Sequence, residues 1–126
     1  MYKISKTFHF SASHNLVGLA EDHPCIRTHG HNYKVKFIFQ SNKLNANGFV
    51  IDYRELEPIK KFIDENLDHR HLNHVMDDIP TAENIAKMLY YFFHDKNLYP
   101  MLVAVEVSET DNTTAYFEPS FDIKTK

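Results

Sequence analysis

A short stretch of the sequence concentrates the residue types that bind metals. Residues 23–31 read HPCIRTHGH and bring four histidine or cysteine side chains into nine positions. If this stretch enters a strand, His29 and His31 point to the same face with Cα atoms ~6.6 Å apart. Both imidazoles can then converge on one ion at Zn–N distances of about 2.0–2.1 Å, and Gly30 leaves room for another element to approach. The plainer interpretation is two ordinary sheet histidines.

A third ligand would complete a catalytic metal site. Three imidazoles hold such a zinc ion and leave the fourth position for water or substrate. His14 continues the apolar alternation of the first predicted strand, which makes it the best third histidine. Cys25 is the rival ligand, because the C-x3-H-x-H spacing does not exclude it. A thiolate would cancel part of the zinc charge, so an open three-histidine site and a closed knuckle with cysteine both remain as interpretations.

Three further residues carry groups suited to acid–base chemistry. Asp68 precedes His69 in LDHRHLNH, residues 67–74, and can orient and tune the imidazole. The alternative is a helix C-terminus, where cationic histidines favour the helix dipole. Glu109 closes the apolar face of a predicted buried strand. A carboxylate there costs free energy unless it is paired or binds a ligand, so Glu109 is a candidate for function.

Alternating hydrophobicity predicts the strands that position the histidines. Residues 2–12 form a half-buried strand, and His14 falls on its apolar face if the strand stays regular that far. Residues 29–39 form a second strand that carries both later histidines on its apolar face. The apolar positions are Ile4, Phe8, Phe10 and Ala12 in the first strand, and Tyr33, Val35, Phe37 and Phe39 in the second.

Two helices are predicted in the middle of the chain. Asp52 and Glu55 resemble a capping box, but Pro58 would lie inside that helix, so regular helix begins near Pro58 instead. Thr81 is the N-cap of a second helix that runs to about His94. The buried faces are Leu56, Ile59, Phe62 and Ile63 in the first helix, and Ile85, Met88, Leu89, Phe92 and Phe93 in the second.

Turn signals and apolar runs complete the predicted order of elements. Asn47-Gly48 predicts a turn into FVIDY and therefore a hairpin. After Pro100, MLVAVEVSE predicts a buried strand with one face formed by Met101, Val103, Val105 and Val107. TTAYF predicts a final strand. The order β-β-α-α-β-β predicts an α+β domain with an antiparallel sheet.

Length and composition limit the class of protein. The chain has 126 residues and 14.8 kDa, which predicts one domain over residues 1–126 with a core of its own. A net charge of -3 offers no basic field for nucleic acid. The single cysteine cannot form an internal disulfide and fits a reducing cytosol. Neither a secretion signal nor an apolar run of membrane-spanning length is expected, so we expect a cytoplasmic protein.

Six motifs together resemble the 6-pyruvoyl-tetrahydropterin synthase family. They occur in the family's order and cover nearly the whole chain. The motifs are FSASH (10–14), C-x3-HGH (25–31), GFVIDY (48–53), LDHRHLN (67–73), PTAEN (80–84) and SET (108–110). The resemblance implies a tunnelling fold, in which a four-stranded antiparallel sheet has two helices on one face. It also implies that three subunits join their sheets into a barrel and that two trimers stack into a hexamer.

The same resemblance implies roles for individual residues. His14, His29 and His31 would hold zinc, while Cys25 would remain free as the catalytic base.

Asp68 and His69 would relay protons to that cysteine from a neighbouring subunit. Glu109 would hold the guanidine-like edge of a pterin, and Thr81 and Glu83 would help to line its pocket. Arg27 would favour the thiolate form of the cysteine and is a candidate for binding the substrate's triphosphate.

The resemblance also implies a reaction. The C-x3-HGH spacing favours the 6-carboxy-5,6,7,8-tetrahydropterin synthase branch, whereas SETDNT resembles the pyruvoyl branch. The carboxy branch converts 7,8-dihydroneopterin triphosphate to 6-carboxy-5,6,7,8-tetrahydropterin, acetaldehyde and triphosphate, on the path to 7-deazapurines such as queuosine. The alternative within the family is 6-pyruvoyl-tetrahydropterin synthase, which eliminates triphosphate and keeps the side-chain carbons. The alternative from another class is a non-catalytic zinc protein.

Overall fold

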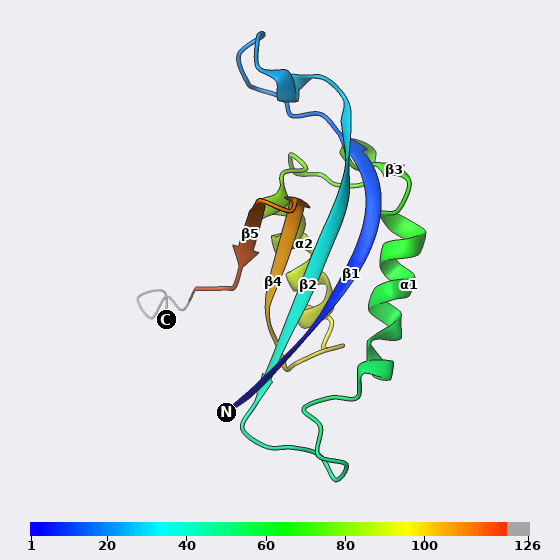
Figure 1. The fold of residues 1–126 in the computed structure, drawn as a ribbon, viewed down its shortest axis with the longest axis vertical. Helices are drawn as coiled ribbons and strands as arrows, with labels where there is room; N and C mark the ends of the chain where they lie inside the picture. Colours follow the sequence, from blue (N-terminus) through cyan, green and yellow to red (C-terminus); the bar gives the residue numbers. More distant parts are fainter. Residues whose placement is uncertain (121–126) are drawn as a thin grey trace.

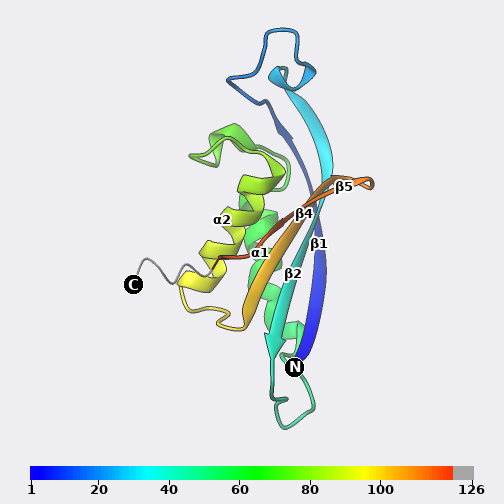
Figure 2. The ribbon, with the colours of Figure 1, turned by 90° about the vertical axis from the view of Figure 1, so that its left-hand side faces the viewer.

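The computed structural model describes residues 1–120 and shows a five-stranded sheet with both helices on one face (Figures 1 and 2). The strand order is β3-β1-β2-β4-β5. Strands β1 (Tyr2–His14), β2 (His29–Ser41), β4 (Leu102–Thr110) and β5 (Thr113–Phe117) pair antiparallel. These four strands are the antiparallel sheet that the sequence predicts. The fifth, β3 (Arg70–His71), was not predicted and pairs parallel with the end of β1.

The β1–β2 ladder positions the histidines. It runs without a break from Tyr2 opposite Ser41 to His14 opposite His29. Strict alternation places large apolar side chains of both strands under the helices and polar side chains on the other face. A slip of one residue would turn every apolar side chain to the wrong face, so burial fixes this register. The two strands and their connecting loop extend past the helices at one end of the molecule (Figures 1 and 2).

The two helices begin where the sequence predicts. Helix α1 (Glu57–Asn66) has Pro58 in its first turn and follows a 3-10 turn, Tyr53–Leu56, whose N-cap is Asp52. The Asp52 carboxylate accepts a hydrogen bond from the backbone N–H of Arg54 at 2.9 Å. Helix α2 (Ala82–Asp95) is capped by Thr81, whose hydroxyl accepts from the backbone N–H of Asn84 at 3.1 Å. Both helices lie on the same side of the sheet (Figure 2), and their buried apolar residues join those of the strands in one core.

The predicted hairpin after Asn47-Gly48 is wrong. A turn is present, with Gly48 at a φ of 86°, but residues 49–53 form no strand. The Asn45 side chain accepts from the backbone N–H groups of Asn47 and Phe49, both at 3.0 Å. Those local bonds use backbone donors that a strand ladder would need. Val50 and Ile51 are buried nonetheless, so their apolar character serves core packing rather than strand pairing.

The predicted alternation of β4 is right only in its second half. Phe39 pairs with Leu102, whereas Ile38 pairs with Ala104, so Val103 is an extra residue in a β-bulge. The bulge brings Leu102 into the core with Val105 and Val107. The other two predicted core positions of this strand, 101 and 103, are therefore only partly buried. No helix within residues 1–120 is long and apolar enough to cross a membrane.

Candidate metal centre and its surroundings

The ends of β1 and β2 bring three imidazoles together. His14, His29 and His31 each offer a ring nitrogen, and these nitrogens all lie within 4.8 Å of one another. The Nε2 atoms of His14 and His29 are 3.0 Å apart. His14 is buried, with 1% of its surface exposed, and the other two are partly exposed. The β1–β2 register and the predicted shared face of the three histidines account for this convergence.

Backbone carbonyls fix the orientation of two of these rings. The Nδ1–H of His14 donates to the carbonyl oxygen of Pro80, and the Nδ1–H of His29 donates to that of Arg27, both at 2.7 Å. A carbonyl oxygen can only accept, so Nδ1 carries the proton in both rings and Nε2 presents a lone pair when the ring is neutral. Such an outer hydrogen bond is what metal-binding histidines usually make.

These lone pairs fit a metal ion. Two unprotonated Nε2 atoms 3.0 Å apart repel each other unless a cation lies between them or one ring takes up a second proton. Tetrahedral zinc with Zn–N distances of 2.0–2.1 Å requires nitrogens about 3.3–3.4 Å apart, and the 3.0 Å between the Nε2 atoms of His14 and His29 is close to that spacing. Burial lowers the pKa of His31, Glu109 opposes this effect, and the two neighbouring imidazoles add to it. The lowered pKa favours the neutral ring that a metal requires.

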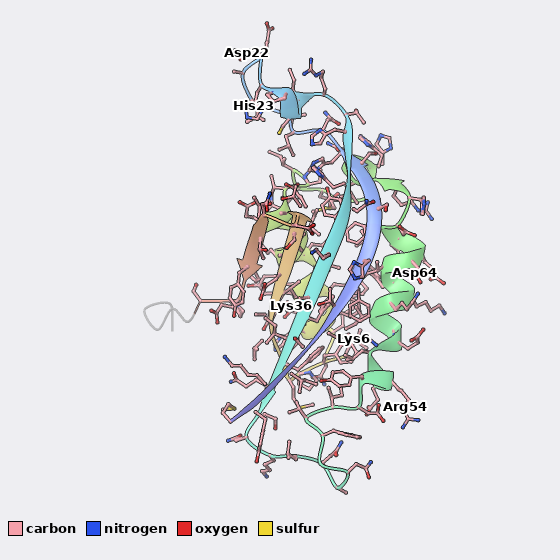
Figure 3. The ribbon with its side chains drawn as sticks, viewed as in Figure 1. Lys6, Asp22, His23, Lys36, Arg54 and Asp64 are labelled. Carbon is pink, nitrogen blue, oxygen red and sulfur yellow. The ribbon has the colours of Figure 1, made fainter. Side chains whose placement is uncertain are left out.

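Cys25 lies outside this set. It occupies the 3-10 turn Pro24–Ile26 and is partly buried, and the group of metal-binding side chains found among residues 1–120 does not include it. Its backbone carbonyl accepts from the N–H of Leu16 at 2.8 Å, and its N–H donates to His23 Nδ1 at 3.1 Å. His23 lies at the projecting loop (Figure 3). This geometry favours the open three-histidine site over the closed knuckle.

Glu109 borders the imidazoles. Its Oε2 lies 3.6 Å from His14 Nε2 and 3.9 Å from His31 Nε2, and its side chain is 27% exposed. A carboxylate at this end of β4 was expected to need a partner, and the imidazoles of His14 and His31 fill that role. Tyr33 is fully buried beneath the same cluster, with its hydroxyl 3.3 Å from His14 Nδ1. Burial raises the pKa of Tyr33, and the Glu109 charge raises it further, so the phenol stays protonated.

The Asp68–His69 pair lies at the outer edge of β1. Asp68 Oδ1 accepts from the backbone N–H of Ser11, and Oδ2 lies 2.9 Å from His69 Nδ1. The Ser11 hydrogen bond holds the pKa of Asp68 below its usual range; burial opposes this shift, and His69 adds to it. His69 has a φ of 59° and an 82% exposed side chain. Hydrogen bonds join this pair to Ser11 and to the carbonyl of Ile63, and none described within residues 1–120 joins it to Cys25.

Three residues were predicted to contact the substrate, and the structure places one in a helix cap and leaves the side chains of the other two exposed. Thr81 caps α2, directly after the Pro80 carbonyl that holds His14. Glu83 is exposed in the first turn of the same helix. The Arg27 side chain is exposed, and its backbone oxygen, rather than its guanidinium, contacts His29. Sequence reasoning missed these carbonyl contacts because no residue type marks a backbone oxygen.

Comparison with known proteins identifies the family. Residues 3–120 match the family described as 6-pyruvoyl tetrahydropterin synthase. The chain belongs to this family.

Two curated relatives in this family carry different names at similar identity. A Synechocystis protein named 6-carboxy-5,6,7,8-tetrahydropterin synthase is 32% identical, over 94% of this chain and 95% of its own length. The human 6-pyruvoyl tetrahydrobiopterin synthase is 29% identical, over 92% of this chain and 90% of its own. The fold of the Caenorhabditis elegans 6-pyruvoyl tetrahydropterin synthase matches with a TM-score of 0.82 at 22% identity, over 94% of this chain and 96% of that one. Family membership alone therefore does not choose between the two reactions.

Proposed function

We propose that this member of the family is a zinc-dependent 6-carboxy-5,6,7,8-tetrahydropterin synthase. It would convert 7,8-dihydroneopterin triphosphate to 6-carboxy-5,6,7,8-tetrahydropterin, acetaldehyde and triphosphate, and so supply 7-deazapurine (queuosine) synthesis in the cytoplasm. The observation that carries the proposal is the set of three converging imidazoles, two of them oriented by carbonyls. The names of several relatives of about 30% identity, from Synechocystis, Rickettsia felis and Bacillus subtilis, support the carboxy product.

The proposed chemistry divides between a metal and the chain's own side chains. His14, His29 and His31 would hold zinc, which supplies a Lewis acid for the hydroxyl groups of the substrate side chain. Cys25, free of the ion, would move protons at the adjacent carbons as a thiolate. Arg27, two residues away in the sequence, would favour that thiolate by its charge.

The remaining candidates would bind the substrate and relay protons. Glu109 would accept hydrogen bonds from the N–H groups of the pterin, in a position bordering the imidazoles. Thr81 and Glu83 would line the same pocket from the start of α2, and Arg27 would help to bind the triphosphate. Asp68 would orient His69 and keep its imidazole ready to exchange a proton with the reacting cysteine.

The position of His69 supports an oligomeric enzyme. Its imidazole is largely exposed at the outer edge of β1, and its visible partner is Asp68 rather than Cys25. We propose that His69 of one subunit meets Cys25 of the next, in a trimer that closes the sheet into a barrel and a hexamer of two such trimers. Strand β5 and most of β1 offer the free sheet edges that this closure requires.

Product analysis tests the proposal. Purified protein loaded with zinc should release acetaldehyde and triphosphate from 7,8-dihydroneopterin triphosphate. Triphosphate without acetaldehyde would instead identify the pyruvoyl reaction, which the SETDNT segment favours. Absence of both products from a protein that binds zinc would favour the non-catalytic alternative. That alternative needs neither Asp68 nor Glu109.

A further inference from the structure

The residue after the buried histidine of β1 is held by a single side chain. The amide of Asn73 accepts from the backbone N–H of Asn15 at 2.9 Å and donates to the backbone carbonyl of the same residue at 2.8 Å. One side chain therefore satisfies both backbone polar groups of the residue that follows His14. Asn73 and Asn15 lie 58 positions apart in the sequence, and both are partly buried.

This contact extends the short pairing between β3 and β1. Strand β3 pairs with β1 for only two residues, with Ala12 opposite Arg70 and Ser13 opposite His71. The chain then turns into the 3-10 segment Leu72–His74, so its backbone leaves the ladder. The amide of Asn73 takes the place of the missing backbone partner, because it offers one acceptor and one donor just as a peptide group does.

The same connection also holds the histidine ring. After the 3-10 segment, the chain reaches Pro80, whose carbonyl accepts from His14 Nδ1 at 2.7 Å. The connection between β3 and α2 thus contacts the end of β1 twice, once at the backbone following His14 and once at its imidazole. Fixing the backbone of Asn15 limits the rotation of the strand end, which would otherwise move Nε2 relative to the other two imidazoles.

We infer that Asn73 is a positioning residue for the metal centre. It does not touch the ion and acts through the backbone at Asn15, which sets the direction of His14. Removing a hydrogen-bond partner of the ligand ring itself typically costs 10–100-fold in metal affinity, so removing Asn73, which acts one step further out, should cost about 10-fold. The inference rests on the metal centre proposed above, so its test measures metal binding directly and does not depend on the reaction.

The experiment compares Asn73→Ala and Asn73→Asp with the wild-type protein. Each full-length protein is stripped with a chelator and titrated with Zn²⁺ against a chromophoric competitor. Asn73→Ala should raise the Kd for zinc by about 10-fold. Asn73→Asp keeps the size and the acceptor but sets a carboxylate oxygen against the Asn15 carbonyl, so it should also weaken binding. If Asn73→Ala does not fold, the Kd of Asn73→Asp for zinc decides the test.

A matched control and a second readout separate positioning from general stability. Asn66 also donates from its amide to a backbone carbonyl, that of Phe62, but at the end of α1, so Asn66→Ala should keep the wild-type Kd. The visible spectrum of the Co²⁺ form should change in both Asn73 variants and not in the control. If the wild-type protein binds zinc and both Asn73 variants have a Kd within twofold of the wild-type value, the inference is overturned and the proposed metal centre is not affected. A wild-type protein that binds no zinc would overturn both.

Discussion

Replacing Cys25 and His31 one at a time separates the role of catalytic base from the role of metal ligand. His31→Ala removes one of three converging nitrogens, and two imidazoles rarely suffice for a catalytic zinc, so both zinc and activity should be lost. Cys25→Ala should keep about one zinc per chain. The backbone of Cys25 is held through Leu16 and His23 rather than through its sulfur, so truncation leaves the turn in place.

The expected loss of rate follows from the proposed role. A missing general base typically costs 10²–10⁴-fold, and Cys25→Ala should fall in that range at saturating zinc. Cys25→Ser should recover little, because an alcohol forms almost no anion near neutral pH. His9→Ala is the matched control for His31→Ala, since His9 is an exposed histidine of β1 outside the converging set. It should change neither zinc content nor rate.

Zinc content by atomic absorption and turnover should be measured on the same samples. X-ray absorption of the wild-type protein adds an independent check, since only nitrogen or oxygen neighbours near 2.0–2.2 Å are expected, without a sulfur shell near ~2.3 Å. If zinc falls in step with activity in Cys25→Ala, or a sulfur shell is present, the cysteine is a ligand and the reasoning is refuted.

Three further predictions follow from the same features. Mixing Cys25→Ala subunits with His69→Ala subunits should restore some activity after subunit exchange, whereas no recovery in exchanging mixtures would mean that each chain holds a complete site. Asp68 has a lowered pKa in the folded protein, so it stabilises the fold above its unfolded pKa of ~3.9 and loses that effect as pH falls through the folded value. Thermal midpoints of wild type and Asp68→Asn should therefore differ most near pH 7 and converge in acid; a constant difference would contradict this. Thr81→Ala removes the N-cap of α2 and should cost about 0.5–2 kcal/mol in urea unfolding, and an unchanged midpoint would show that the cap contributes nothing.

The sequence predicted the elements that depend on neighbouring residues, namely the strands of alternating hydrophobicity and the starts of the helices. The alternation in residues 2–12 and 29–39 reflects burial of one sheet face, and the same alternation places the three histidines together. Proline at position 58 and threonine at position 81 mark the starts of the helices because their effects on φ and on the first N–H groups are local.

The parts that could not be predicted depend on contacts between distant residues. The segment from Asp68 to Pro80 is held to the end of β1 by hydrogen bonds between residues 57 to 66 positions apart in the sequence, among them Asp68 with Ser11 and Pro80 with His14. The bulge at Val103 depends on how β4 meets β2, which the sequence of β4 alone does not contain. The failed hairpin after Gly48 shows that an apolar run can be buried without pairing.

The unbroken β1–β2 ladder places His14 opposite His29, and the loop between them, which carries the proposed catalytic base, adds only the Arg27 carbonyl to the described contacts of the histidine rings. The chain leaves the ladder at His14 and returns at His29, so the meeting of their Nε2 atoms is set by strand register. Residues 17–23 at the tip are exposed, and doubling the length of a flexible loop costs only about 0.6 kcal/mol. The tip can therefore change in length at little cost in stability, while the register of β1 and β2 stays the same. Grafting a longer or shorter tip while keeping Arg27 would move the proposed base, Cys25, relative to three histidines that stay in place, which makes this loop the natural place to engineer a different product.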